Sequence, residues 1–201
     1  MKKILPFFSY LFHPIFIPLL GTVLYLLFNE NYFTIEQSYL VLFQILIITI
    51  FLPMAFFYLL KTFGKVDSIM LSDVNQRKIP LLLQMALTSV LITQSITVER
   101  FPELFFFFFA GLITTFIAFV LLFFKVKSSI HMIGISALSF FVIGLSMHNQ
   151  INIIYTIATL FFFTGIIASS RLYMKAHTMT ELILGYIIGM VPQIGIWYFW
   201  L

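Results

Sequence analysis

Long apolar stretches, separated by short polar connections, make up most of this chain of 201 residues. A helix of about 20 apolar residues crosses the hydrocarbon core of a bilayer and satisfies its own backbone hydrogen bonds there. Only 9% of the residues are charged, against about 25% in soluble domains. The sequence therefore excludes a water-soluble domain and predicts an all-α, polytopic transmembrane helix bundle of about six to seven spans. The expected spans cover residues 5–28, 39–60, 80–98, 104–124, 132–147, 151–169 and 181–201.

Residues 1–201 are expected to form a single integral-membrane domain, because no linker, repeat or low-complexity tail divides the stretches. The third and fifth stretches are short for a membrane span. The first stretch contains Pro6, Pro14 and Pro18. These prolines predict a kink, because proline cannot continue the hydrogen bonding of a helix.

Basic residues gather in one set of connections. Ten of the eleven Lys and Arg residues precede the first span or follow an even number of crossings: Lys2, Lys3, Lys61, Lys65, Arg77, Lys78, Lys125, Lys127, Arg171 and Lys175. The other set contains only Arg100, beside four glutamates. By the positive-inside rule, we expect the N-terminus and the basic connections on the cytoplasmic side of a bacterial cytoplasmic membrane. Such a small juxtamembrane set of bases does not favour nucleic-acid binding.

The last basic connection carries the most unusual group of polar residues. Arg171 lies in an otherwise apolar segment, where a charge is costly and marks a candidate functional site. His177 and Glu181 are four residues apart, which places them on the same face of a helix. The carboxylate can then accept the imidazole N–H and make the other ring nitrogen more basic. The planar fork of the arginine suits phosphate oxygens.

Two other connections hold further candidates. One contains Arg77 and Lys78, and the other covers residues 127–131, with Ser129 and His131. All three connections follow an even number of crossings, so they must share one face of the membrane. A site with several parts can assemble at that face.

Together the three connections resemble the signature of the type 2 phosphatidic acid phosphatase superfamily, the lipid phosphatases related to vanadium haloperoxidases. The third motif of that family, Ser-Arg-x5-His-x3-Asp, matches here at every specified position except the last, where Glu181 replaces Asp. The second motif, Pro-Ser-Gly-His, keeps its serine and histidine as Ser129 and His131, with Ser128 and Ile130 at the other two positions.

The first motif of the family, Lys-x6-Arg-Pro, is the least well matched. Arg77 fits its arginine, Met70 occupies the lysine position, and Pro80 lies two positions late. The resemblance covers roughly residues 65 to 190, with the motifs in the family order. Many family members carry the first two motifs in one loop, whereas two apolar stretches separate them here.

The resemblance implies a role for each matched residue. His177 would be the nucleophile that forms a phosphohistidine, and Glu181 would orient it. His131 would protonate the leaving oxygen and afterwards activate water. The expected phosphate-binding residues are Arg171, Arg77, Ser129, Ser170, Lys127 and Lys78, with Lys127 or Lys78 replacing the missing lysine. This scheme requires no metal and no cofactor.

The expected function is metal-independent hydrolysis of a lipid phosphomonoester or pyrophosphate at the membrane surface. Phosphatidate, phosphatidylglycerophosphate, a polyprenyl diphosphate and a glycolipid phosphate are all candidate substrates, and phosphoryl transfer to another lipid would use the same residues. The main alternative is a non-catalytic family member that acts as a membrane-complex subunit or lipid-binding scaffold, which the altered first two motifs favour. A small-solute transporter would need polar residues in the middle of several spans, and few are present.

The remaining charged and histidine residues have simpler interpretations. His13 and His148 are interpreted as packing or helix-end residues, as most single histidines on apolar helices are. Four lysines are expected to anchor helices at the interface: Lys61, Lys65, Lys125 and Lys175. Asp67 and Asp73 are expected to pair with these bases.

Overall fold

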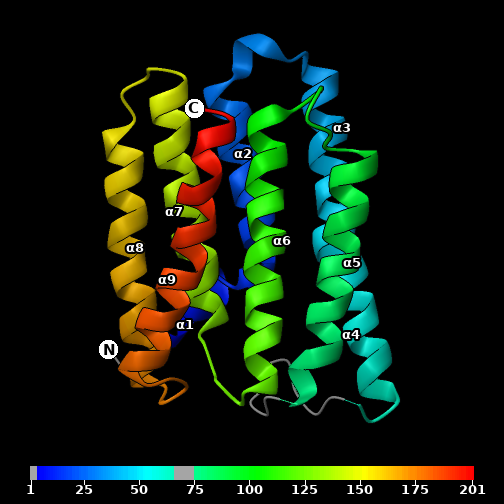
Figure 1. Cartoon of the computed structure of the whole chain (residues 1–201), viewed down its shortest axis with the longest axis vertical. Helices are drawn as coiled ribbons and strands as arrows, with labels where there is room; N and C mark the ends of the chain where they lie inside the picture. Colours follow the sequence, from blue (N-terminus) through cyan, green and yellow to red (C-terminus); the bar gives the residue numbers. More distant parts are fainter. Residues whose placement is uncertain (1–3, 66–74) are drawn as a thin grey trace.

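The chain is all-helical in the computed structural model, which describes residues 4–65 and 75–201 (Figure 1). The α-helices are α1 Ile4–Leu11, α2 Ile17–Phe28, α3 Ile35–Leu46, α4 Leu52–Thr62, α5 Lys78–Gln94, α6 Pro102–Phe123, α7 Ile130–His148, α8 Ile154–Tyr173 and α9 Met179–Ile196. Short 3-10 helices are η1 Pro14–Phe16, η2 Glu30–Tyr32, η4 Asn75–Arg77 and η5 Trp197–Phe199, and η3 Ile47–Phe51 is a π-helical segment between α3 and α4. Lys2, Lys3, Asp67, Met70 and Asp73 lie outside the described residues.

Within the described ranges, six helical segments are long and apolar enough to cross a membrane: Leu5–Phe28, Ile35–Thr62, Pro102–Phe123, Ile130–His148, Ile154–Tyr173 and Met179–Phe199. The protein is therefore a multi-pass integral membrane protein, as the sequence predicts. The third stretch forms α5, whose 17 residues give a length of about 25 Å, slightly below the hydrocarbon thickness. The fifth stretch forms α7, which has 19 residues.

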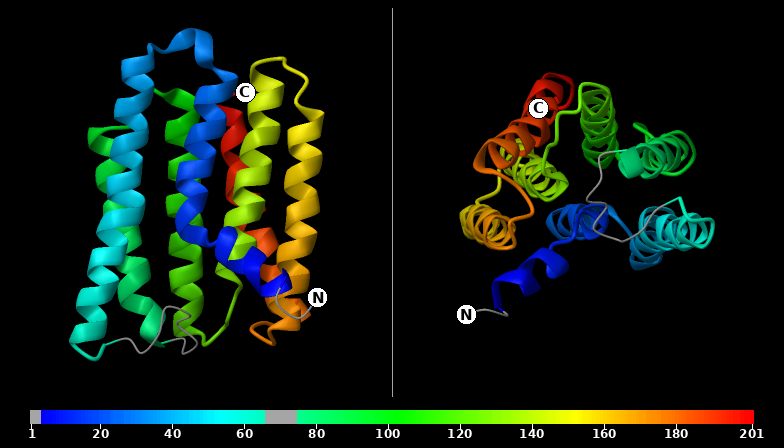
Figure 2. Two further views of the ribbon diagram at one scale, coloured as in Figure 1. Left: turned by 180° about the vertical axis from the view of Figure 1, so that it is seen from behind. Right: turned by 90° about the horizontal axis from the view of Figure 1, so that it is seen from below.

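The first span is broken near its start, as its prolines predict. α1 ends at Leu11, and the chain resumes as η1 at Pro14 and then as α2. The Nδ1 atom of His13 accepts a hydrogen bond of 3.3 Å from the N–H of Ile15 and so caps η1. α1, which precedes the break, runs in a different direction from α2 and packs against α8 (Figure 2).

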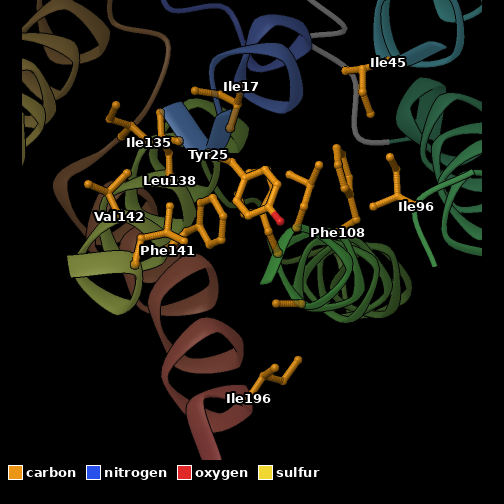
Figure 3. Close-up of a cluster of buried hydrophobic side chains, with 14 of the residues drawn as sticks. Ile17, Tyr25, Ile45, Ile96, Phe108, Ile135, Leu138, Phe141, Val142 and Ile196 are labelled. Carbon is orange, nitrogen blue, oxygen red and sulfur yellow. The ribbon is translucent and has the colours of Figure 1, made fainter. Parts of the chain in front are cut away.

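α7 is the central helix of the bundle. It packs against α9, α8 and α2, and 67% of its span is buried. Ile135, Leu138, Phe141 and Val142 on this helix belong to the main hydrophobic cluster (Figure 3). The ring of Phe141 stacks on Phe107 of α6, with 4.4 Å between the centroids. A helix buried on most sides is apolar around most of its surface, which explains why α7 has no clear polar face.

The backbones of α7 and α9 are in direct contact at two glycines. A methyl group on Gly185 would lie 2.6 Å from the carbonyl oxygen of Ser129, and one on Gly189 would overlap Ser136 and the carbonyl of Ile133. The N–H of Ser129 also donates a 3.2 Å hydrogen bond to the carbonyl of Glu181. Small residues allow such an approach between membrane helices. The contact fixes the start of α7 against the first turn of α9.

The basic connections lie at one end of the bundle, as span parity predicts. The end of α4, the start of α5 and the α6–α7 and α8–α9 connections are all at the lower end in Figure 1. The C-terminus lies at the opposite end. The predicted site residues of all three connections are therefore brought to one end of the molecule.

A polar cluster joins three helices at the opposite end. Tyr25 of α2 donates a 3.0 Å hydrogen bond to Glu103 of α6, and His148 of α7 lies 3.1 Å from the other oxygen of that carboxylate. Asn149 donates to the side chain of Asn29 over 3.1 Å. These contacts connect α2, α6 and α7 far from the basic connections, and His148 takes part in them as a helix-end residue.

We expect the substitution Gly189→Ala to lower the free energy of unfolding by about 1–3 kcal/mol, because the methyl group would be forced into the backbone of α7. Gly195→Ala on the same helix is the matched control, since a methyl group there meets nothing within 4 Å. Thermal unfolding in detergent checks both variants. Equal stability of the two variants would contradict the close contact.

Candidate active site

The start of α9 is organised by Glu181. Nδ1 of His177 donates a 2.7 Å hydrogen bond to Oε2 of this carboxylate. The same oxygen accepts from the N–H of Thr178 over 3.4 Å, while the hydroxyl of Thr178 accepts from the N–H of Glu181 over 3.3 Å. Thr178 and Glu181 therefore form a capping box, a local signal that can be read from their three-residue spacing.

This arrangement gives the two nitrogens of His177 different roles. Because Nδ1 carries the proton that Glu181 accepts, Nε2 of a neutral ring is left with a free lone pair. The predicted pairing of His177 with Glu181 is present in the described structure. The capping box also uses the longer side chain of Glu, which offers a reason for Glu at a position where Asp is expected from the resemblance.

Arg171 in the last turn of α8 is buried, with 5% of its surface exposed. Among the described residues, neither its Nε nor its Nη1 has a hydrogen-bond partner. The positive charge of Arg171 interacts electrostatically with the rings of His131 and His177, and the positive charge of Arg77 repels it. Buried donors are almost always paired, and buried charges are costly without a counter-ion. The guanidinium is therefore placed to bind an anion.

The start of α7 supplies a second buried donor. Ser129 is the N-cap residue of α7, yet its hydroxyl makes no capping hydrogen bond. The hydroxyl oxygen is buried and has no partner among the described residues. The first N–H groups of any helix also lack partners within the helix and favour negative charge. Ser129 and the first turn of α7 thus add donors beside His131.

Arg77 and Lys127 connect the other two basic connections to the site. Nη1 of Arg77 donates to the carbonyl of Ser128 over 3.4 Å, which brings the start of α5 against the α6–α7 connection. Nζ of Lys127 donates to the carbonyl of Ala176 over 3.0 Å, and its charge acts on His177. These contacts link the start of α5 to the α6–α7 connection, and that connection to the α8–α9 connection.

Two predicted phosphate-binding residues make other contacts. The ammonium group of Lys78 lies 5.2 Å from the ring centroid of Phe123 on α6. The hydroxyl of Ser170 shares a 2.6 Å hydrogen bond with the hydroxyl of Ser9 on α1. Of the two lysines considered for the missing family lysine, Lys127 is thus the one whose charge acts on the His177 ring.

α1 covers His131, a contact that the sequence does not predict. Nε2 of His131 lies 3.0 Å from the carbonyl oxygen of Ser9, so this nitrogen is the donor. The ring of His13 packs edge-on against His131, with 5.4 Å between the centroids. A contact with a backbone carbonyl has no sequence signature, and the only available signal for His13 was its position before Pro14.

Burial lowers the pKa of His177 below the ordinary value for histidine. The positive charges of Arg171 and Lys127 lower this pKa further, whereas the hydrogen bond and the charge of Glu181 oppose the effect. The imidazole is therefore neutral near pH 7, with Nε2 unprotonated. Within the described ranges, no group of three or more His, Asp or Glu residues is arranged to hold a metal ion.

We expect Lys127→Gln to raise the pKa of His177, because removing a nearby positive charge favours the protonated ring. The neutral ring would then become protonated at a higher pH than in the wild type. NMR titration of isotope-labelled histidines can measure the pKa of His177, because the chain has only four histidines to assign. Lys175→Gln is the control, because this lysine lies in the same connection as His177 and is exposed. An unchanged midpoint in Lys127→Gln would show that its charge does not act on His177.

Comparisons of this chain with protein families, with curated proteins and with solved structures find no match.

Proposed function

We propose that this protein is a membrane-embedded phosphatase that hydrolyses a lipid phosphomonoester or pyrophosphate through a phosphohistidine intermediate. The proposal is carried by two features that occur together. His177 is neutral and oriented by Glu181, and the buried Arg171 has no partner for Nε and Nη1 among the described residues. Phosphoryl transfer needs a nucleophile and positive donors that bind the phosphoryl oxygens.

In the first step, Nε2 of His177 attacks phosphorus and the bond from phosphorus to the lipid oxygen breaks. His131 in its protonated form gives a proton to that oxygen, and the negative charge of the bound phosphate favours this protonated form. The leaving oxygen takes the place of the Ser9 carbonyl as the partner of Nε2 of His131.

In the second step, His131 takes a proton from water and the resulting hydroxide attacks phosphorus. The bond between phosphorus and Nε2 breaks, which releases inorganic phosphate and restores neutral His177. Arg171, Arg77 and the hydroxyl of Ser129 stabilise the charge on the phosphoryl oxygens through both steps, with Lys127 beside them.

A lipid is the substrate class best supported, because the site lies at the end of a membrane bundle. The headgroup would reach the basic end while the hydrocarbon part stays among the helices or in the bilayer. Phosphatidate, phosphatidylglycerophosphate, a polyprenyl diphosphate and a glycolipid phosphate all fit this description. Transfer of the phosphoryl group to a second lipid would use the same residues.

A non-catalytic lipid-binding or subunit role is the second candidate. The observation that favours it is the hydrogen bond between Nε2 of His131 and the carbonyl of Ser9, which occupies the proposed acid. In this case the Arg171 site would bind a lipid phosphate without turnover.

Phosphate release from a panel of lipid phosphates, in the presence of a chelator, tests the proposal. We expect His177→Ala to lower kcat/KM by at least about a thousandfold and Arg171→Gln by about a hundredfold or more. Lys175→Gln, which changes an exposed lysine of the same connection, should keep full activity. Equal activity in His177→Ala and the wild type would exclude the histidine as nucleophile.

The same variants distinguish catalysis from binding. Inorganic phosphate at 100 times its Kd should stabilise the wild type and Lys175→Gln against unfolding by about 2.7 kcal/mol. Arg171→Gln should lose this stabilisation. Phosphate stabilisation without any phosphate release would favour the non-catalytic role.

We also propose that the basic end of the bundle faces the cytoplasm of a bacterial cell, in line with the positive-inside rule. The chain has no cysteine, so single cysteines can report the orientation. Lys125→Cys at the basic end should react with a membrane-impermeant maleimide only after the cells are opened. Glu99→Cys at the other end should react in intact cells, and the reverse pattern would invert the orientation.

A further inference from the structure

A cavity of about 490 Å³ lies between η1, α4, α5, α6 and α7, next to the candidate active site. This volume is within the range of about 300–1,000 Å³ that is usual for small-molecule sites. Most of its wall is apolar, as in the group Pro53, Met54, Phe57, Leu83, Phe108 and Ile133. α5 and α6, which lie in the chain between Arg77 and Ser129, form much of the wall.

One end of the cavity lies beside His131, and the cavity continues from there into the bundle. His13, whose ring packs on His131, and Ile130, which precedes His131, both line it. On α5 the lining residues extend from Pro80 to Thr88, a rise of about 12 Å along the helix. The cavity therefore runs along the helix axes, away from the basic end.

Most polar side chains in the wall form hydrogen bonds within the protein. Thr49 donates to the carbonyl of Ile45, and Thr115 to that of Gly111, both over 2.8 Å. Three further lining residues behave in the same way: Gln84 donates to Thr88, Thr114 to the carbonyl of Ile188, and Gln193 to the carbonyl of Phe107. Tyr10 and Tyr58 also line the cavity. A polar solute would find few free partners here, whereas a hydrocarbon chain needs none.

His13 differs from these hydrogen-bonded residues, and it lies at the end of the cavity nearest the site. Its Nδ1 accepts the N–H of Ile15, so in a neutral ring Nε2 carries the proton and can donate. The cavity thus offers a donor near His131 and an apolar interior beyond it. This order of surfaces matches a molecule with a phosphate head and a hydrocarbon chain.

We propose that this cavity, formed between α4, α5, α6 and α7, binds the hydrocarbon chain of the lipid phosphate, and that the open space at Gly111 admits long chains. The proposal rests on the proposed function, since it takes the phosphate of the same molecule to lie at Arg171. Gly111 lines the cavity, and a methyl group on it would meet nothing within 4 Å. The space beside α6 at this point is therefore available to a ligand.

Gly111→Leu tests the assignment, because the new side chain would fill part of the cavity. Gly165→Leu is the matched control: a methyl group on Gly165 also meets nothing within 4 Å, and this residue on α8 does not line the cavity. Both changes are introduced into full-length protein in lipid nanodiscs, once with intact His177 and once with His177→Ala. Equal melting temperatures of the two leucine variants establish that both fold.

Binding of hexadecyl phosphate and of hexyl phosphate is measured in the His177→Ala background, and phosphate release from both in the intact enzyme. Each methylene group that loses its place is worth about 0.8 kcal/mol, so Gly111→Leu should weaken hexadecyl phosphate binding at least about tenfold. Hexyl phosphate binding should stay within about twofold, and Gly165→Leu should change neither. The same ratio should appear in kcat/KM.

The outcomes separate this proposal from the proposed function. Equal losses for the long and the short chain, a loss in Gly165→Leu, or no loss in Gly111→Leu would each overturn the chain assignment. Selective weakening of hexadecyl phosphate without phosphate release from the wild type would support the chain assignment and refute the phosphatase. Phosphate release that is indifferent to Gly111→Leu would do the opposite.

Discussion

α7 and α9 approach so closely that a methyl group on Gly185 or Gly189 would run into the backbone or side chains of α7. The hydrogen bond from the N–H of Ser129 to the carbonyl of Glu181 lies at the end of this contact. One helix carries His131 and the other begins directly after His177. The distance between the two histidines is therefore set by backbone packing rather than by flexible side chains, which is the kind of support that precise positioning needs.

The second organising factor is positive charge in an apolar setting. Arg171 is buried beside Arg77, and Lys127 acts on the neighbouring His177. Like charges at short range lower stability, and desolvation adds to the cost. A cluster of Arg171, Arg77 and Lys127 therefore lowers stability, which argues against a purely structural purpose for it. Burial lowers the pKa of His177 and these charges lower it further, while Nε and Nη1 of Arg171 have no partner among the described residues.

Much of this could be predicted from the sequence, because it depends on local spacing. Apolar length predicts the spans, and the four-residue spacing of His177 and Glu181 predicts their hydrogen bond. Two features depend instead on how distant helices turn toward one another. The contact of His131 with the carbonyl of Ser9 and the position of Lys78 on Phe123 belong to this class. The cavity is likewise defined by side chains that are missing, as at Gly111, which no motif records.

The break before Pro14 separates α1 mechanically from the rest of the first span. The exposed residues on α1 include Phe7, Tyr10 and Leu11, so this short helix presents an apolar face to the surrounding lipid. Its other face holds Ser9 against His131 and Ser170. The same short helix therefore presents apolar residues to the lipid and a hydrogen-bond acceptor to His131. The lipid around this protein is thus separated from the hydrogen-bond partner of His131 only by the width of one short helix.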